Sequence, residues 1–263
     1  MTNGSPLFSR RRFLASGAAG AAGLVLGGCD RLSAAPTFRE FLASAEGLTE
    51  RVQRALLRDG ALAREYSAAD VSATFRANGS QDANNLPPEY MELARTGFSG
   101  WRLEVNGLVT RPASFSLADL RALPVRTQIT RHDCVEGWSC IGGWAGPRLS
   151  TILDRVGLRP EARFIVFRCA DELPRYVNGA NLFYESVDLI DAFHPQTILA
   201  LEMNGAPLPL AHGAPLRLRV ERQLGYKMAK FLTRIEAVDG LNGIGRGKGG
   251  TWEDDGYEWY AGI

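Results

Sequence analysis

The chain has 263 residues, of which 45% are hydrophobic and 22% are charged, and its formal net charge at pH 7 is +1. These values are typical of a globular protein with one large domain, alone or with short additional segments. The small net charge and the lack of long runs of like charge give no reason to expect nucleic acid as a partner.

The first 29 residues predict an export signal that is separate from the fold. Ser9 to Leu14 reads SRRRFL, which fits the twin-arginine pattern, and a weakly apolar run rich in glycine and alanine follows it. That run is too short and too rich in glycine to predict a spanning helix. Leu26 to Cys29 reads LGGC and resembles a lipobox, whose cysteine becomes the lipidated first residue of the mature chain. The alternative is cleavage nearby, with Cys29 unmodified.

These features predict a periplasmic protein that is exported in the folded state. Asp30 follows the lipobox and resembles the signal that keeps some bacterial lipoproteins on the inner membrane. We therefore expect contact with the membrane only through a lipid anchor. If Cys29 carries the lipid, then Cys134, Cys140 and Cys169 remain, which is an odd number in an oxidising compartment. A Cys134–Cys140 disulfide is one explanation, and a thiolate bound to a metal is the other.

The sequence after the signal predicts a helical segment, residues 30–70, and a larger domain, residues 71–263. Apolar residues between Thr37 and Tyr66 have helical spacing and predict one or two amphipathic helices. Residues 75–88 are rich in turn formers and predict an irregular loop.

Beyond residue 100 the pattern predicts short strands interspersed with short helices. Strands are expected at 101–109, 125–130, 164–167, 198–203, 216–220 and 230–238. Helices are expected to begin after the N-cap residues Ser116, Ser150 and Ser186. This mixture indicates an α+β fold with a substantial amount of sheet.

Three segments carry the candidate chemistry. They read CVEGWSCIGGWAGPRLSTIL from Cys134, EMNGAPLPLAHGAPLRLRV from Glu202 and LGYKMAKFLTRIE from Leu224. In length, order and spacing they resemble the molybdopterin-binding domain of the sulfite oxidase family, which includes periplasmic methionine sulfoxide reductases. The resemblance covers residues 75–238. It implies the fold of that family, a molybdenum-molybdopterin cofactor in the mono-pterin form, and an oxidoreductase activity.

The resemblance implies that Cys134 is the protein ligand of the metal. Sulfur ligands suit molybdenum, and the thiolate is the form of cysteine that binds metals. One alternative is a zinc site of His132, Cys134 and Cys140, which lacks a fourth ligand. Another is a thiol enzyme with Cys134 as nucleophile and His132 as base, for which no orienting third group is evident.

The resemblance also implies contacts with substrate and cofactor. Arg76 and Asn78 resemble the Arg-Asn element of the family, in which the arginine faces an anionic substrate and the asparagine touches the pterin, although Ala77 separates them here. Phe183 stands where sulfite oxidases have a catalytic tyrosine, so sulfite oxidation is in doubt unless the adjacent Tyr184 replaces it. The other cofactor contacts that the resemblance implies are Cys169, His212, Arg217, Met228, Ala229 and Lys230, of which His212, Arg217 and Lys230 hold the phosphate and the pterin.

Two further groups have no clear role in the resemblance. Arg219 is two residues after Arg217 on an alternating strand and is expected to face solvent. The aromatic residues of the C-terminal tail either line the mouth of the pocket or only pack against the domain.

Together these patterns predict an enzyme that carries out two-electron oxygen-atom transfer on a small sulfur or nitrogen oxide. The chain has no C-x-x-C-H haem motif, so electrons are expected to be exchanged with a separate cytochrome or membrane haem protein. A cofactor-free thiol enzyme and a lipoprotein binding module are the alternatives.

Overall fold

The computed structural model describes residues 35–57, 60–80, 86–172 and 182–263. The twin-arginine motif and Cys29 lie outside the described residues. The chain forms two compact units, residues 1–55 and 56–263. In the first unit, helix α2 (Pro36–Leu56) confirms the amphipathic helix that the sequence predicts, although it ends ten residues earlier. Within the described part of the chain, no helix combines the length and the apolar character that crossing a bilayer requires.

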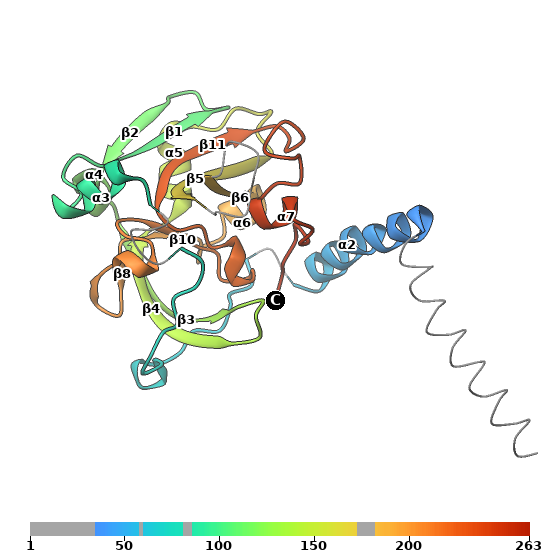
Figure 1. The fold of residues 1–263 in the computed structure, drawn as a ribbon, viewed down its shortest axis with the longest axis horizontal. Helices are drawn as coiled ribbons and strands as arrows, with labels where there is room; N and C mark the ends of the chain where they lie inside the picture. Colours follow the sequence, from blue (N-terminus) through green and yellow to red (C-terminus); the bar gives the residue numbers. More distant parts are fainter. Residues whose placement is uncertain (1–34, 58–59, 81–85, 173–181) are drawn as a thin grey trace, which may run out of the picture. The chain divides into compact units, whose positions relative to one another are not determined.

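The second unit contains a five-stranded mixed sheet. Strand β1 (Arg102–Gly107) runs parallel to its neighbour β11 (Leu232–Val238), and every other pair in the sheet is antiparallel. Figure 1 shows these strands stacked in the upper part of the unit. The order across the sheet is β2 (Ala113–Ser116), β1, β11, β5 (Phe164–Glu172) and β6 (Leu182–Asp188).

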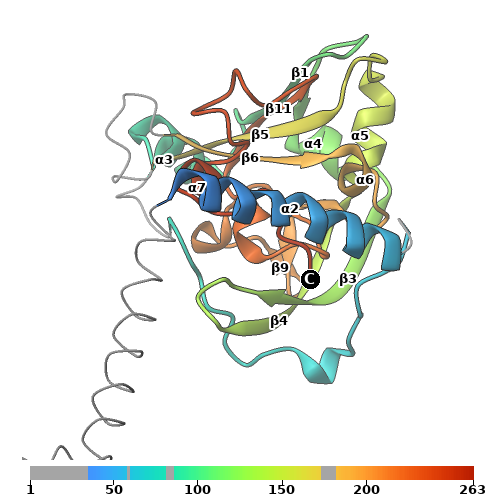
Figure 2. The same cartoon turned by 90° about the vertical axis from the view of Figure 1, so that its right-hand side faces the viewer.

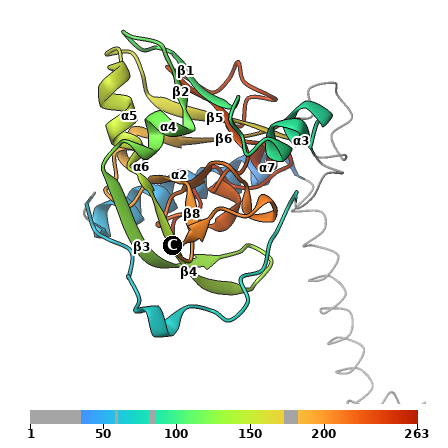
Figure 3. The ribbon, with the colours of Figure 1, turned by 90° about the vertical axis from the view of Figure 1, so that its left-hand side faces the viewer.

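A second sheet lies on the opposite side of the unit. It is dominated by the long hairpin of β3 (Val125–Asp133) and β4 (Ser139–Pro147), which continues into β8 (Glu202–Met203) and β9 (Ala206–Pro207). All three ribbon views place β3 and β4 away from β1, β5 and β6, most clearly in Figure 3. A two-stranded ladder of β7 (Ile198–Ala200) and β10 (Arg217–Arg219) completes the sheets. The sequence pattern does not reveal β4, because its glycines weaken the strand signal.

Short helices flank the five-stranded sheet (Figure 2). Helix α4 (Leu117–Arg121) begins at Ser116 as predicted, since the Ser116 hydroxyl accepts a hydrogen bond from the Asp119 N–H at 3.1 Å. Helix α5 (Leu149–Val156) begins after Arg148, so the predicted Ser150 cap is wrong, and Gly157 ends the helix at a φ of +67°. Helix α3 (Pro88–Arg95) was not predicted.

Helix α6 (Leu189–Ala192) corrects a further expectation. Its N-cap is Asp188, and Ser186 lies inside β6 instead of starting a helix. The main core lies between the five-stranded sheet and the helices α4 and α5, where Leu103, Ile152 and Phe167 are fully buried. The mixture of sheets and short helices confirms the predicted α+β class.

Candidate functional site

A pocket lies where β3 ends and distant segments of the chain meet. Cys134 follows β3 directly and lines the pocket together with Asn78, Met228 and Lys230. The Asn78 amide nitrogen lies 3.8 Å from the Cys134 sulfur. The turn after β3 is closed by a hydrogen bond of 2.9 Å from the Cys134 N–H to the Trp138 carbonyl. The structure therefore brings together four of the predicted site residues, although they are up to 152 positions apart in sequence.

Cys134, Cys140 and Cys169 are free thiols, so the alternative of a Cys134–Cys140 disulfide is wrong. Cys134 is 8% exposed and sits at the pocket. The Cys140 sulfur instead lies 3.7 Å from the Thr74 carbonyl oxygen. Cys169 is buried in β5 and is not among the lining residues. Burial raises the pKa of its thiol well above the ordinary value, so Cys169 stays protonated.

His132 does not support the thiol-enzyme alternative. Its Nδ1 lies 3.0 Å from Arg219 Nη1 and 3.3 Å from Met228 Sδ. An arginine can only donate, so Nδ1 accepts and the ring proton is on Nε2. Burial, followed by the charges of Arg219 and Arg217, lowers the pKa of His132 well below its ordinary value. Among the described contacts neither ring nitrogen bonds to Cys134, and no group of three His, Cys, Asp or Glu side chains there is placed to hold a metal ion.

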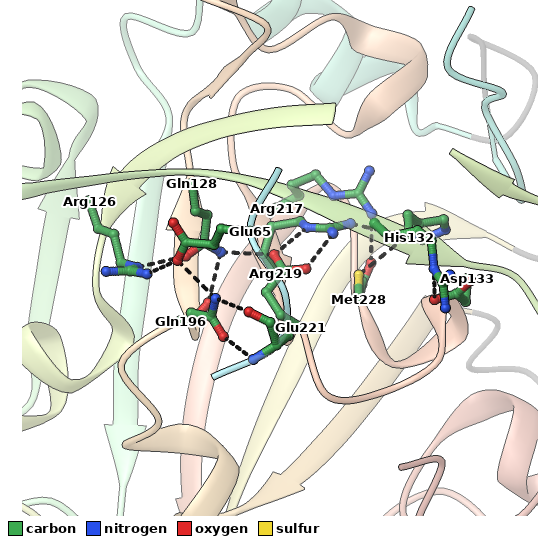
Figure 4. A network of polar contacts seen from close by, with 12 residues as sticks. Glu65, Arg126, Gln128, His132, Asp133, Gln196, Arg217, Arg219, Glu221 and Met228 are labelled. Carbon is green, nitrogen blue, oxygen red and sulfur yellow. Dashed lines mark hydrogen bonds and ion pairs between the residues drawn. The ribbon is translucent and has the colours of Figure 1, made fainter. Parts of the chain in front are cut away.

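Arg219 is fully buried, which contradicts its expected position in solvent. Two hydrogen bonds join its guanidinium to the Glu221 carboxylate, from Nε at 3.0 Å and from Nη2 at 2.7 Å. Figure 4 shows that the contacts continue from Glu221 to Gln128, whose amide donates at 2.8 Å, and onward to Arg126. All three residues of β10 are buried, and this ion pair neutralises the charge of Arg219 inside the protein.

Arg217 and His212 are not among the residues that line the pocket, but the positive charges of Arg217 and Lys230 act on each other and on His212. Arg217 donates to the carbonyl oxygens of His212 at 3.1 Å and Met228 at 3.3 Å, and its Nε has no partner in the described part of the chain. Burial and then the charge of Arg219 lower the pKa of Arg217 to about 9. Burial and then the charge of Arg217 lower the pKa of His212 to about 4 and that of Lys230 to about 7.

Burial lowers these pKa values more than the carboxylates of Glu221 and Asp171 raise them, so the charges of Arg217 and Lys230 are only partly balanced. Buried cations and unpaired donors are stabilised by a bound anion. Arg217 and Lys230 therefore fit the phosphate group of the cofactor that the sequence resemblance implies. The predicted phosphate contacts of Arg217 and His212 stay predictions; Arg217 has the unpaired donor that this role requires, whereas His212 is neutral near pH 7.

Lys230 has a second task in this structure. Its ammonium donates to the carbonyl oxygens of Asn78 at 2.7 Å, Ala211 at 3.1 Å and Ser80. Lys230 thereby holds the segment with Asn78 against the turn η3 (Leu210–His212). The three protons of the ammonium are occupied in this way, so Lys230 contributes to the pocket mainly through its charge. The Ala229 carbonyl accepts the Leu218 N–H at 2.8 Å, so this oxygen is also occupied.

Arg76 lies at the rim of the site, exposed to solvent. Its guanidinium is 3.7 Å from the Glu136 carboxylate and lies over the Trp138 ring, 5.3 Å from the ring centre. Glu136 is itself among the lining residues. The structure thus places Arg76 near the pocket but not in its lining. From this position it can face an arriving substrate.

Tyr184 is not placed as a catalytic residue, which corrects the prediction made from the sequence. Its hydroxyl donates to the Asp254 carboxylate at 2.6 Å, and its ring packs in a small core with Val166 and Ile244. Phe183, the preceding residue of β6, lines the pocket instead. Neighbouring residues of a strand face opposite sides, so the two cannot exchange roles without a shift of the strand.

The C-terminal tail contributes to the pocket through two of its aromatic residues. Trp252 in α7 (Thr251–Asp254) and Tyr257 line the pocket, and their ring centres are 5.4 Å apart. Trp259 instead packs edge-on against Phe164 and donates to the Ser186 hydroxyl at 2.9 Å. Both sequence interpretations of the tail are therefore partly correct.

A buried charge cluster holds this tail in place. Lys227, in the turn η4 (Gly225–Lys227), lies between two carboxylates, 2.7 Å from that of Glu185 in β6 and in contact with that of Glu253 in α7. All three side chains are at most 1% exposed. Two carboxylates and one ammonium leave one uncompensated negative charge. Burial raises the pKa of Glu185 well above its ordinary value, so this group retains a proton more readily than in the unfolded chain.

Lys227→Met should destabilise the protein by about 3–5 kcal/mol, because two carboxylates remain buried without their cation. Glu185→Gln should cost far less, since it leaves one ammonium facing one carboxylate. Because the folded pKa of Glu185 is raised, its contribution to stability falls as the pH rises above the unfolded pKa, and Glu185→Gln should remove this decline. Denaturant unfolding between about pH 5 and 8 measures both effects. Equal losses in the two variants would contradict this account.

Several pocket residues escaped the sequence interpretation, namely Ser80, Asp171, Gly225 and Tyr226. Gly225 is required by packing, since a Cβ at this position would collide with the imidazole of His132. Asp171 is a charged residue near the end of an otherwise apolar strand, and this is the signal that could have revealed it.

Comparison with known proteins agrees with the sequence resemblance. The chain is 39% identical over 171 residues to a protein of Azospira oryzae named as the protein-methionine-sulfoxide reductase subunit YedZ1, and the match covers 65% of this chain and 59% of that protein. It is 33% identical over 148 residues to the protein-methionine-sulfoxide reductase catalytic subunit MsrP of Xanthomonas campestris, covering 54% and 46%. The chain thus spans about half the length of these relatives.

The chain also resembles a solved structure and matches a family description. The sulfane dehydrogenase SoxCD from Paracoccus pantotrophus matches with a TM-score of 0.48 and 24% identity, over 54% of this chain and 39% of that one. Residues 90–242 match the family described as the oxidoreductase molybdopterin binding domain, and this range includes Cys134 and all the predicted cofactor contacts except Asn78. The chain belongs to the oxidoreductase molybdopterin-binding domain family, whose cofactor is molybdopterin.

Proposed function

We propose that this protein is a molybdenum-molybdopterin oxidoreductase that reduces a small sulfoxide or a related sulfur or nitrogen oxide. The observation that carries the proposal is the pocket at Cys134, in which a buried thiol meets the Asn78 amide within a molybdopterin-binding domain. When bound, the cofactor would supply two-electron oxygen-atom transfer.

The residues of the chain have separate tasks in this proposal. Cys134 would bind the metal as a thiolate, and the Asn78 amide would donate a hydrogen bond to that sulfur and keep it oriented. Arg217 and His212 would hold the phosphate group of the cofactor. The apolar side chains of Phe183, Met228 and Trp252 form part of the pocket lining and would keep water from the reacting group.

The identity of the pocket residues favours reduction of a sulfoxide over oxidation of sulfite. Phe183 lines the pocket where sulfite oxidases have a tyrosine, and the Tyr184 hydroxyl is bound to Asp254. The position of Phe183 therefore has no phenol hydroxyl that could contact a substrate, while Tyr226 and Tyr257 lie elsewhere on the pocket lining. The names of the two relatives support the same direction, because both refer to methionine sulfoxide reduction.

The cellular setting is also part of the proposal. The twin-arginine motif and the lipobox support export in the folded state to the periplasm, followed by anchoring to the inner membrane through Cys29. Reduction of the substrate needs two electrons, and the sequence has no C-x-x-C-H motif for a c-type haem. A separate haem protein, either a cytochrome or a membrane protein, would supply these electrons.

The proposal is tested with purified, molybdenum-loaded protein and an artificial electron donor. Addition of methionine sulfoxide, dimethyl sulfoxide or trimethylamine N-oxide should cause oxidation of the donor, with the sulfoxides reacting best. A preparation that oxidises sulfite with an artificial acceptor, but reduces none of the three oxides, would show that the proposed reaction is wrong.

A further inference from the structure

One oxygen of a buried carboxylate that lines the pocket has no hydrogen-bond partner among the described residues, and the sequence resemblance does not explain this carboxylate. Asp171 lies near the end of β5, is 3% exposed and is one of the lining residues. Its Oδ1 is buried and has no hydrogen-bond partner among the described residues, and the same is true of the Ser80 hydroxyl, which also lines the pocket. Ser80 is 1% exposed.

Buried polar groups in native proteins almost always have partners, so a buried carboxylate oxygen without one at the lining of a pocket indicates a ligand. A carboxylate can only accept hydrogen bonds, and therefore requires a ligand that donates them. Burial raises the pKa of Asp171 to about 6, against the opposing effects of the Ser80 hydroxyl and the charge of Lys230. Asp171 is thus mainly ionised at neutral pH and able to accept.

The site consequently has two chemically different ends. Arg217 provides positive charge and an unpaired Nε donor, whereas Asp171 provides an acceptor. Lys230 lies under the influence of both, because Arg217 lowers its pKa and Asp171 raises it. A phosphate next to Asp171 would be repelled, since like charges close together in a buried site are strongly unfavourable.

Molybdopterin has the same two kinds of end. Its phosphate is an anion that accepts hydrogen bonds, and its pterin ring carries an amino group beside a ring N–H, both of which donate. We propose that Asp171, with Ser80 beside it, binds the N–H edge of the pterin and so fixes which way the cofactor lies in the pocket. Asp171 is then a binding residue that recognises the amino group of the pterin, while Arg217 recognises the phosphate of the cofactor. This inference depends on the proposed function.

The test compares Asp171→Asn with Glu172→Gln, a control at the next residue of the strand, which is exposed. Each variant is purified after expression with the cofactor pathway active, and the pterin is released by oxidation and measured by its fluorescence. Asp171→Asn should lower the pterin content per chain by about tenfold or more, because a charge-assisted acceptor is lost. Glu172→Gln should keep the content of the wild type. Equal content in all three proteins would overturn the proposal.

Thermal unfolding of the cofactor-free proteins separates binding from a structural role. Asp171→Asn should be at least as stable as the wild type in this form, because it removes an unpaired buried charge. A loss of stability in the cofactor-free variant, parallel to the loss of pterin, would also overturn the inference. The wild type reports on the proposed function separately: if it contains no pterin, the proposed function fails, whereas full loading of both wild type and Asp171→Asn refutes only the role of Asp171.

Discussion

Replacing Cys134 with serine should abolish the oxidoreductase activity while leaving the fold intact. The side chain is 8% exposed, and its described polar contact is the Asn78 amide at 3.8 Å, which a serine hydroxyl can also engage. The change in unfolding free energy should therefore stay within about 1 kcal/mol. A hydroxyl is a poor substitute for a thiolate toward a metal that prefers sulfur ligands, so activity should fall by at least about a hundredfold.

The matched control for this variant is Cys140→Ser. Cys140 is also a free thiol, lies six residues away and contacts the Thr74 carbonyl instead of the pocket. It should retain activity and the absorption band that arises between the thiolate and molybdenum, whereas Cys134→Ser should lose both. Wild-type activity in Cys134→Ser would remove the basis for assigning this residue as the metal ligand.

Arg217→Ala should lower the molybdopterin content of the purified protein by about tenfold or more. The guanidinium is buried and its Nε is unpaired, so it is placed to bind an anion strongly. A charge-assisted hydrogen bond contributes about 1.5–3 kcal/mol, and each 1.4 kcal/mol corresponds to about a tenfold change in affinity. Molybdenum and pterin analysis of the variant gives the answer directly.

The choice of control for Arg217 depends on the structure. Arg219 looked suitable from the sequence, but it is buried and paired with Glu221, so Arg219→Ala would leave that carboxylate unpaired and destabilise the fold. Arg234 in β11 is exposed and is the better control. Arg234→Ala should keep the cofactor, and an equal loss in Arg217→Ala and Arg234→Ala would point to a general effect of charge instead of a specific contact.

Residue pattern and motif spacing are enough to predict the class of fold and the centre of the site. The motif around Cys134 marks the pocket, and the structure places Asn78 and Met228 beside it as the resemblance implies. Local rules also predict the start of α4 at Ser116, because a capping residue acts through bonds within its own turn.

Other features depend on contacts between distant segments and cannot be read from local pattern. Ser186 has the chemistry of a helix cap but lies inside β6, where it pairs with Val166 of β5. Arg219 has the pattern of an exposed residue, yet it is buried. Glu221 neutralises its charge, and the Gln128 amide donates a hydrogen bond to Glu221. Asp171 becomes a candidate site residue only when the fold shows that its carboxylate is buried and that one of its oxygens has no hydrogen-bond partner among the described residues.

The central claim is that the Cys134 pocket holds molybdenum through a single molybdopterin. The most direct measurement is the molybdenum and pterin content of the purified protein, produced with an active cofactor pathway and compared with Cys134→Ser and Arg217→Ala. The account predicts molybdenum and pterin in equal amounts, each close to the amount of protein, with the pterin reduced in Arg217→Ala. Wild-type protein that is folded but contains neither molybdenum nor pterin would contradict it.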